Sequence, residues 1–184
     1  MTGVLIISTN YGTETDEIRR PIEAFREADV PVTVASVDGG EIRTVVGDRA
    51  EGPVVDSDTT LAEVAASDYD LVVIPGGTVN ADTLRTDPDA QRIVRGAASA
   101  GIPVAAICHG PWLLVSTDLV VGKTLTSYPS LAVDVTNAGG TWVDEEVSVD
   151  PTNGFTLVTS RTPDDLPAFI RAASEARDAR VKDE

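Results

Sequence analysis

The stretch IPVAAICHGPWLL at residues 102–114 decides the architecture that this sequence predicts. Its apolar half, residues 102–107, predicts a buried strand, and the segment that opens at His109 and Gly110 predicts a helix. Cys108 therefore falls at a strand-to-helix turn, where the positive end of the helix would favour the thiolate over the thiol. Cys108 is the only cysteine of the chain and His109 is its only histidine. This pair is the strongest indication that the protein is an enzyme.

Short apolar blocks and helical patterns alternate on either side of this stretch. We expect strands at residues 3–8, 30–35 and 70–74, and helices at 14–27 and 87–100. Buried strands that alternate with helices predict a parallel, doubly wound α/β sheet. Functional sites in such sheets lie at the carboxyl ends of the strands. The turn at Gly76 and Gly77 and the turn at Cys108 should therefore meet at one edge of the sheet.

The rest of the chain gives weaker patterns that still fit one domain over residues 1–184. Residues 37–56 suggest a hairpin or an excursion of the chain, and a short segment at 123–126 precedes a helix near 131–137. Strands are expected near residues 141–143, 146–149 and 155–159. The last helix would begin with Thr162 as N-cap and Asp165 completing a capping box, and would end in a charged tail from about residue 176.

The charge of the chain restricts its partners. Fourteen Lys and Arg against thirty Asp and Glu give a formal net charge of −16. Such an excess of anions repels nucleic acid and anionic membranes, so we expect neither as a partner. The composition favours the salt-rich cytoplasm of a halophilic archaeon, because the Debye length falls to ~3 Å at 1 M salt and self-repulsion is screened. An ordinary acidic protein is the alternative.

The cellular location is predicted from two features. No apolar stretch approaches the ~20 residues that a membrane-spanning helix needs, and the N-terminal residues lack a basic and apolar signal pattern. A single cysteine cannot form a disulfide within the chain, which fits a reducing compartment. We therefore expect a cytoplasmic protein.

Several residues near the two turns could support a nucleophilic cysteine. The backbone N–H groups of Gly77 and His109 could stabilise an oxyanion, although a plain turn would also explain the glycines. Glu14 and Glu17 follow the first strand, and either could stay protonated against the sulfur, although a solvated surface acid is the simpler interpretation. Consecutive side chains tend to diverge, so we do not expect a simple pair between Cys108 and His109.

A bound metal or cofactor is not predicted. The adjacent cysteine and histidine lack the spacing of a closed zinc site. A phosphate-binding glycine pattern is also missing from the sequence after the first strand. The alternative for the cysteine itself is a buried structural thiol, but its place at the turn beside the histidine favours a functional role.

Five short blocks together resemble the PfpI branch of the PfpI/ThiJ family. They are IPGG at 74–77, AICHGP at 106–111, NAGG at 137–140, WVD at 142–144 and TSRTPDDLP at 159–167. The resemblance extends from Val4 to about Ala173. It implies a flavodoxin-like three-layer sandwich with a mostly parallel central sheet, related to class I glutamine amidotransferases. It also implies Cys108 as the nucleophile and an oxyanion hole from the backbone of Gly77 and His109.

The resemblance also implies two acids and an oligomer. The acid of the first strand stands seven residues before a proline in the family, and Glu14 stands seven before Pro21, which favours Glu14 over Glu17. A second acid contacts the histidine of a neighbouring subunit. Asp82 takes that place if a one-residue insertion precedes Ala81, and Ala81 takes it otherwise. A homo-oligomer, either a dimer or a hexamer, follows.

The function that the resemblance implies is a cysteine-dependent hydrolase without a cofactor. Its substrate would be a peptide or amide bond, as in an intracellular protease, or a small carbonyl adduct, as in a deglycase or glyoxalase-like stress protein. In this scheme Glu14 holds a proton against Cys108, and His109 acts as general acid and base with Asp82. The alternative is a redox-sensing stress protein whose cysteine is oxidised without turnover. A glutaminase subunit is disfavoured because its cysteine and histidine would be far apart in the sequence.

Overall fold

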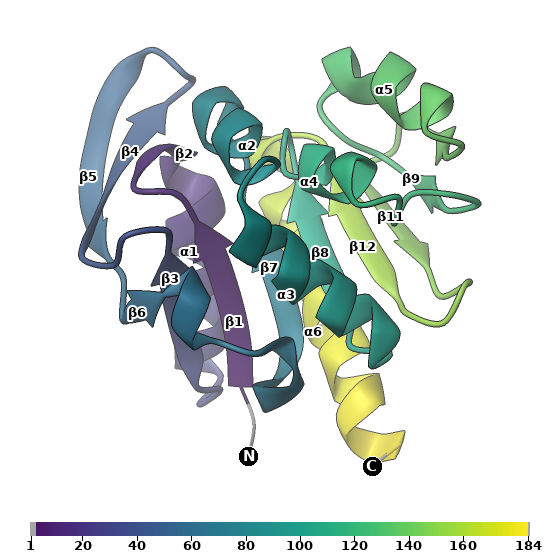
Figure 1. The fold of residues 1–184 in the computed structure, drawn as a ribbon, viewed down its shortest axis with the longest axis horizontal. Helices are drawn as coiled ribbons and strands as arrows, with labels where there is room; N and C mark the ends of the chain where they lie inside the picture. The colour runs from purple at the N-terminus through teal and green to yellow at the C-terminus, as the bar shows by residue number, and fades with distance from the viewer. Residues whose placement is uncertain (1–2, 184) are drawn as a thin grey trace.

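The computed structural model describes residues 3–183 and contains a central seven-stranded sheet in the order β11-β12-β8-β7-β1-β3-β6 (Figure 1). All neighbouring strands pair in parallel except β11, which is antiparallel to β12. The strands are β1 (Gly3–Ser8), β3 (Val32–Ser36), β6 (Thr59–Thr60), β7 (Tyr69–Ile74), β8 (Val104–Ile107), β11 (Val147–Asp150) and β12 (Leu157–Ser160). The predicted α/β fold with a mostly parallel sheet is confirmed.

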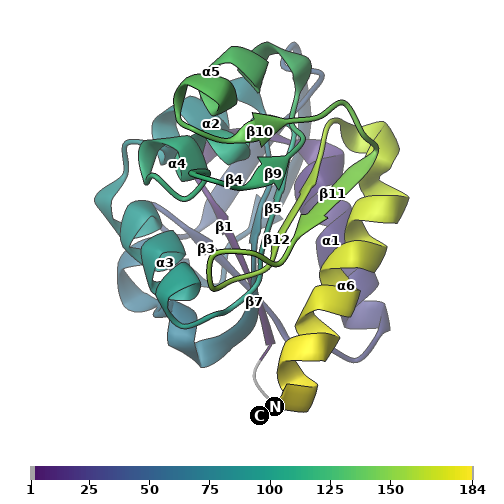
Figure 2. The same ribbon diagram turned by 90° about the vertical axis from the view of Figure 1, so that its right-hand side faces the viewer.

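Helices cover both faces of this sheet. Figure 2 shows α1 and α6 on one side, and α3 with α2 and α4 on the other. The helices are α1 (Thr15–Glu27), α2 (Thr78–Leu84), α3 (Pro88–Ser99), α4 (Pro111–Ser116), α5 (Ala132–Asn137) and α6 (Leu166–Asp183). Four short 3-10 helices are η1 (Leu61–Glu63), η2 (Ala66–Asp68), η3 (Pro129–Leu131) and η4 (Pro163–Asp165). The result is a three-layer sandwich.

The alternation of side chains along β1 explains why its sequence is apolar throughout. Leu5 and Ile7 belong to the core under α3, whereas Val4 and Ile6 belong to the core under α1 and α6. A strand with a helical layer on each face buries both sets of side chains. All six residues of β1 are accordingly buried, and so are the four residues of β8. These two strands form the rigid support of the site.

A three-stranded sheet in the order β2-β4-β5 stands beside the main sheet (Figure 1). It consists of β2 (Tyr11–Glu14), β4 (Glu41–Val46) and β5 (Ala50–Asp56), so the hairpin predicted at residues 37–56 is confirmed. The turn between β4 and β5 has Gly47 at φ 60° and Asp48 at φ 56°. Two consecutive positive φ angles are typical of the tight turns that join twisted antiparallel strands. A further pair of short strands, β9 (Thr124–Leu125) and β10 (Thr141–Trp142), lies near α5.

The start and the end of the last helix differ from the prediction. Thr162 makes no side-chain cap, and the Asp165 N–H donates to the backbone oxygen of Thr162 at 3.0 Å instead. Both carboxylate oxygens of Asp165 bind the guanidinium of Arg161. The predicted capping box is therefore wrong. The charged segment from about residue 176 is not a separate tail, since α6 continues to Asp183 and Arg177 forms an ion pair with Asp70 at 3.5 Å. Within residues 3–183, no helix is both long and apolar enough to span a bilayer.

Candidate active site

Cys108 lies directly after β8, at the carboxyl edge of the parallel strands, and its backbone is in the left-handed region with φ 60°. A left-handed non-glycine residue costs roughly 1–3 kcal/mol and persists only where its surroundings hold it. Here the Cys108 N–H donates to Ser160 O at 3.0 Å, and Cys108 O accepts from the Tyr128 N–H at 2.9 Å. The predicted turn between strand and helix is confirmed, and the hydrogen bonds to Ser160 and Tyr128 hold it in place.

The surroundings of the thiol disfavour its ionisation. Only 7% of the Cys108 surface is exposed. Burial, and after it the charge of Glu17, raise the pKa of Cys108, while the backbone N–H groups of Gly77 and His109 lower it. Desolvation of the charged form opposes the effect expected of the following helix, and the preference of that helix for the thiolate stays a prediction. Ionisation of the Cys108 thiol therefore requires a proton acceptor and an uncharged neighbouring side chain in the same cleft.

Glu17 is the acid that lies against the sulfur. It is fully buried on α1, its Oε2 accepts a hydrogen bond from the Gly76 N–H at 2.7 Å, and its side chain interacts with Cys108. Burial raises the pKa of Glu17 to about 8, so the carboxyl group is protonated at neutral pH. A Cβ atom on Gly76 would lie 2.6 Å from Glu17 Oε2 and 2.7 Å from Cys108 Cβ. Glycine at this position is what lets the acid and the thiol meet.

The choice of Glu14 over Glu17 as that acid is wrong. Glu14 ends β2, and its Oε2 accepts from the Gly47 N–H at 2.8 Å, so its carboxyl group faces the hairpin turn. Burial raises the pKa of Glu14 as well, although the Gly47 N–H opposes the shift. The spacing to Pro21 pointed to the wrong acid, but helical periodicity could have found the right one. Glu17 lies on the buried stripe of α1 that also contains Ile18.

His109 contacts the sulfur directly. Its Nδ1 lies 3.2 Å from Cys108 Sγ, and its ring stacks on Tyr128 with centroids 4.6 Å apart. The expectation that the two adjacent side chains would diverge is wrong, since the left-handed turn at Cys108 does not point them apart as a strand would. Burial lowers the pKa of His109, and the charge of Asp48 partly restores it. The imidazole is therefore neutral at neutral pH and can accept a proton.

Two backbone N–H groups converge on the same sulfur. Those of Gly77 and His109 both interact with the Cys108 side chain. Gly77 has φ 85°, and a Cβ atom there would lie 2.1 Å from Gly12 O, so the turn requires glycine. The two donors predicted from the sequence are thus brought together. Their use as an oxyanion hole stays a prediction.

The site opens into a cleft of about 440 Å³. Its lining is Glu14, Asp16, Glu17, Val46, Gly47, Asp48, Gly77, Thr78, Cys108, His109, Tyr128, Thr162 and Pro163. Asp82 is exposed on α2 and is not part of this lining, so its role towards another subunit stays a prediction. Sequence reasoning missed Asp48 and Thr78. The position of Thr78 directly after the two glycines was the available signal.

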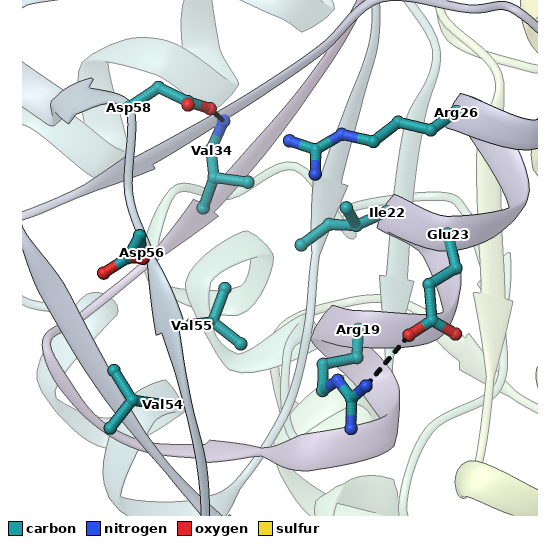
Figure 3. A pocket seen from close by; sticks show the side chains of 9 residues that line it. All are labelled: Arg19, Ile22, Glu23, Arg26, Val34, Val54, Val55, Asp56 and Asp58. Atoms are coloured by element: carbon teal, nitrogen blue, oxygen red, sulfur yellow. Dashed lines mark hydrogen bonds and ion pairs between the residues drawn. The ribbon is translucent and has the colours of Figure 1, made fainter.

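A second hollow of the described residues is lined by no cysteine, histidine or serine. This hollow, of about 390 Å³, lies between α1 and β5 (Figure 3). It contains an ion pair of Arg19 with Glu23 at 3.1 Å, and Asp58 accepts from the Val34 N–H at 2.8 Å. Among residues 3–183, the His, Cys, Asp and Glu side chains form no group of three or more that could hold a metal ion.

Comparisons with known proteins agree with this geometry. A sequence profile of the DJ-1/PfpI family matches residues 2–176. "Protein/nucleic acid deglycase 2" of Escherichia coli is 41% identical over 87% of this chain and 89% of its own length. "Putative cysteine protease YraA" of Bacillus subtilis is 40% identical over 86% of this chain and 88% of its own length. The crystal structure of Drosophila melanogaster DJ-1beta superposes with a TM-score of 0.81 at 31% identity, covering 100% of this chain and 95% of that one. The chain belongs to the DJ-1/PfpI family.

Proposed function

We propose that this protein is a cysteine-dependent hydrolase of small carbonyl adducts, that is, a deglycase of the PfpI type. The observation that carries the proposal is the position of Cys108 Sγ, 3.2 Å from His109 Nδ1 and in contact with the buried, protonated Glu17. A nucleophile, a base and a proton donor therefore share one cleft. The relative in Escherichia coli that is named as a deglycase supports the same substrate class.

The chemistry starts with proton transfer from the Cys108 thiol to His109 Nδ1. The sulfur then attacks the hemiaminal carbon of an α-oxoaldehyde adduct, a C–S bond forms, the C–N bond breaks, and the amine leaves with the proton from His109. The oxoaldehyde is now a hemithioacetal on Cys108. A proton then moves from its first carbon to the second and the hydroxyl proton moves from the first oxygen to the second, which gives a thioester. Water hydrolyses the thioester and releases a 2-hydroxy acid and the free thiol.

Glu17, Gly77 and His109 each have a place in these steps. Glu17 holds an O–H group beside the sulfur and adds no charge that would oppose the thiolate. The N–H groups of Gly77 and His109 can donate to the oxygen that becomes anionic when water attacks the thioester. The cleft volume of about 440 Å³ suits a compact adduct. Peptide hydrolysis would use the same thiolate and oxyanion donors, and the relative named after a cysteine protease makes it the second candidate.

The test is a parallel assay of the purified protein with methylglyoxal, with a methylglyoxal-treated amino acid and with a fluorogenic peptide. We expect release of lactate and free amine from the adduct, and its loss in Cys108→Ala. Turnover of the peptide alone would replace the proposal with the protease. Activity that survives Cys108→Ala would contradict both. If no substrate is turned over while mild peroxide oxidises Cys108, the redox-sensing alternative replaces the hydrolase.

We also propose that the protein is a homo-oligomer, either a dimer or a hexamer, in which Asp82 of one subunit contacts His109 of another. Exposed apolar side chains on the small sheet support self-association, with Tyr11 56%, Val46 51% and Val54 51% exposed. Light scattering after size exclusion in molar KCl should give a multiple of the 19.3 kDa chain mass. A monomer would remove the proposed contact of Asp82.

We also propose that the protein is located in a cytoplasm with a high salt concentration. This location is supported by the single cysteine and by the net charge of −16. Fractionation of the source cells, followed by detection of the protein with an antibody, should place it in the cytosolic fraction. Detection mainly outside the cells would contradict this proposal.

A further inference from the structure

The side chains of Asp48, Thr78 and His109 form a series of polar contacts that leads to Cys108 Sγ. Asp48 lies in the β4–β5 turn, and its Oδ1 accepts from the Thr78 N–H at 2.8 Å and its Oδ2 from the Thr78 hydroxyl at 2.6 Å. The Thr78 oxygen is in turn 3.4 Å from His109 Nε2, and His109 Nδ1 is 3.2 Å from Cys108 Sγ. A continuous chain of polar contacts therefore runs from Asp48 to the nucleophile within one subunit.

The direction of these hydrogen bonds follows from the donor inventory. An ionised carboxylate only accepts, so the Thr78 hydroxyl must use its single hydrogen on Asp48. The remaining lone pairs of that oxygen can only accept, so His109 Nε2 must carry the hydrogen between them. In a neutral imidazole the other nitrogen, Nδ1, then has the free lone pair. That nitrogen is the one that faces Cys108 Sγ.

We infer that Asp48 and Thr78 are positioning residues that select the Nε2–H tautomer of His109 and so leave Nδ1 as the base beside the Cys108 thiol. The inference rests on the proposed function, because it gives that reaction its first proton transfer. Asp48 acts on His109 through Thr78 within one chain, and the proposed contact of His109 with Asp82 of another subunit is a separate one. Neither Asp48 nor Thr78 was singled out by the sequence.

The charges around His109 agree with this assignment. The titratable groups that line the cleft with it are Glu14, Asp16, Glu17, Asp48, Cys108 and Tyr128, and Arg85 packs over the adjacent Trp112 ring at 5.3 Å. Among the charges of the described residues, that of Asp48 is the one that raises the pKa of His109 against the effect of burial. Asp48 thus also stabilises the imidazolium that forms when Nδ1 takes the thiol proton.

Glu14 acquires a role in this arrangement. Its Oε2 holds the N–H of Gly47, the residue before Asp48 in the turn. Both turn residues have positive φ, so the turn has a defined shape. The acid that the sequence placed against the sulfur therefore anchors the loop that carries the orienting carboxylate.

The test uses the fact that His109 is the only histidine of the chain, so its ring nitrogens can be assigned directly in ¹⁵N-labelled protein. Long-range ¹H–¹⁵N spectra report the tautomer, and a pH series reports the pKa of His109. The variants are Thr78→Val, which keeps the shape but removes the hydroxyl, Thr78→Ser, which keeps it, and Asp48→Asn. Asparagine tolerates the left-handed backbone at this position. Asp38→Asn, at an exposed acid outside the cleft lining, controls for the loss of one charge.

We expect the Nε2–H tautomer to dominate in the wild-type protein and in Thr78→Ser, and to lose its dominance in Thr78→Val and Asp48→Asn. Asp48→Asn should also lower the pKa of His109, because the charge that opposes the effect of burial is removed, whereas Asp38→Asn should not. The acid limb of the kcat–pH profile should move with it, which a purely structural effect would not produce.

A wild-type protein with the Nδ1–H tautomer would overturn the inference, and so would Asp48→Asn and Thr78→Val spectra that match the wild type. Backbone amide spectra show whether each variant is folded. If Thr78→Val does not fold, the comparison of the His109 spectra of Asp48→Asn and Asp38→Asn tests the inference. The spectra need no substrate, so a confirmed tautomer without turnover would contradict only the proposed function. Turnover that depends on Cys108 but not on Asp48 or Thr78 would contradict only the inference.

Discussion

The carboxyl group of Glu17 accepts a hydrogen bond from the Gly76 backbone N–H over 2.7 Å while fully buried beside the Cys108 thiol. One hydrogen bond does not compensate the loss of water around a carboxylate, so burial raises the pKa of Glu17 to about 8. The folded protein therefore holds a proton that the unfolded chain releases near pH 4.5. This relationship links the stability of the protein to the chemistry of its site.

Replacing Glu17 by Gln should remove a pH dependence of stability. The raised pKa means that the stabilisation from neutral Glu17 is complete below pH 4.5 and is lost as the pH rises through about 8. The loss amounts to up to about 5 kcal/mol for this one group. Urea unfolding at pH 5 and pH 9 should show that the free energy of unfolding of Glu17→Gln rises relative to that of the wild type as the pH increases. Glu27→Gln, at the exposed end of the same helix, should not, and equal pH slopes in both variants would contradict the prediction.

The reactivity of Cys108 should respond to the same substitution. Ionised Glu17 raises the pKa of Cys108, and Gln cannot ionise. Glu17→Gln should therefore move the pH midpoint of iodoacetamide alkylation at Cys108 to a lower value, as followed by mass spectrometry. Glu14→Gln should move it less, because the Glu14 carboxyl group faces Gly47 rather than the sulfur. A larger shift in Glu14→Gln would restore Glu14 as the acid that tunes the thiol.

These acids show how far the sequence predicts the site. Cys108 and the glycine turn at Gly76 were placed correctly, because strand ends and glycines are local signals that the chain carries within a few residues. The choice between Glu14 and Glu17 depended on the direction in which each side chain leaves the start of α1. That direction is set by tertiary packing, since β2 forms only when β4 pairs with it. Local spacing could not supply this contact.

The fold was more predictable than the details of its polar contacts. The parallel sheet follows from apolar strands such as residues 3–8 and 70–74, whose burial on both faces leaves a strong pattern. The capping box at Thr162 failed because the Asp165 N–H donates to the backbone oxygen of Thr162 rather than to its hydroxyl group. The contact of Asp48 with Thr78 joins residues 30 apart in sequence and has no local signal.

Lys123 should be a large contributor to stability. It is fully buried, and its ammonium group donates to the backbone oxygens of Asp150, Thr152 and Phe155 and lies 3.7 Å from the Asp150 carboxylate. Lys123→Met would leave these acceptors without a donor, so we expect a loss of roughly 3 kcal/mol in urea unfolding. The matched control is Lys182→Met, since Lys182 is the only other lysine and is exposed. A smaller loss of unfolding free energy than in the control would contradict this prediction, because it would show that the methionine side chain replaces the buried ammonium group without cost.

Molar salt should stabilise the protein. The net charge of −16 is carried largely by surface acids, and Asp38, Glu27 and Asp82 are examples of exposed carboxylates. Their mutual repulsion weakens as the Debye length falls from about 10 Å at 0.1 M to about 3 Å at 1 M. Thermal unfolding should therefore give a Tm that rises between 0.1 M and 3 M KCl. Since concentrated salt can also strengthen apolar burial, a variant that replaces several exposed acids by Asn or Gln is the control, and its Tm should rise less. A Tm that stays constant or falls would contradict the halophilic interpretation and leave an ordinary acidic protein.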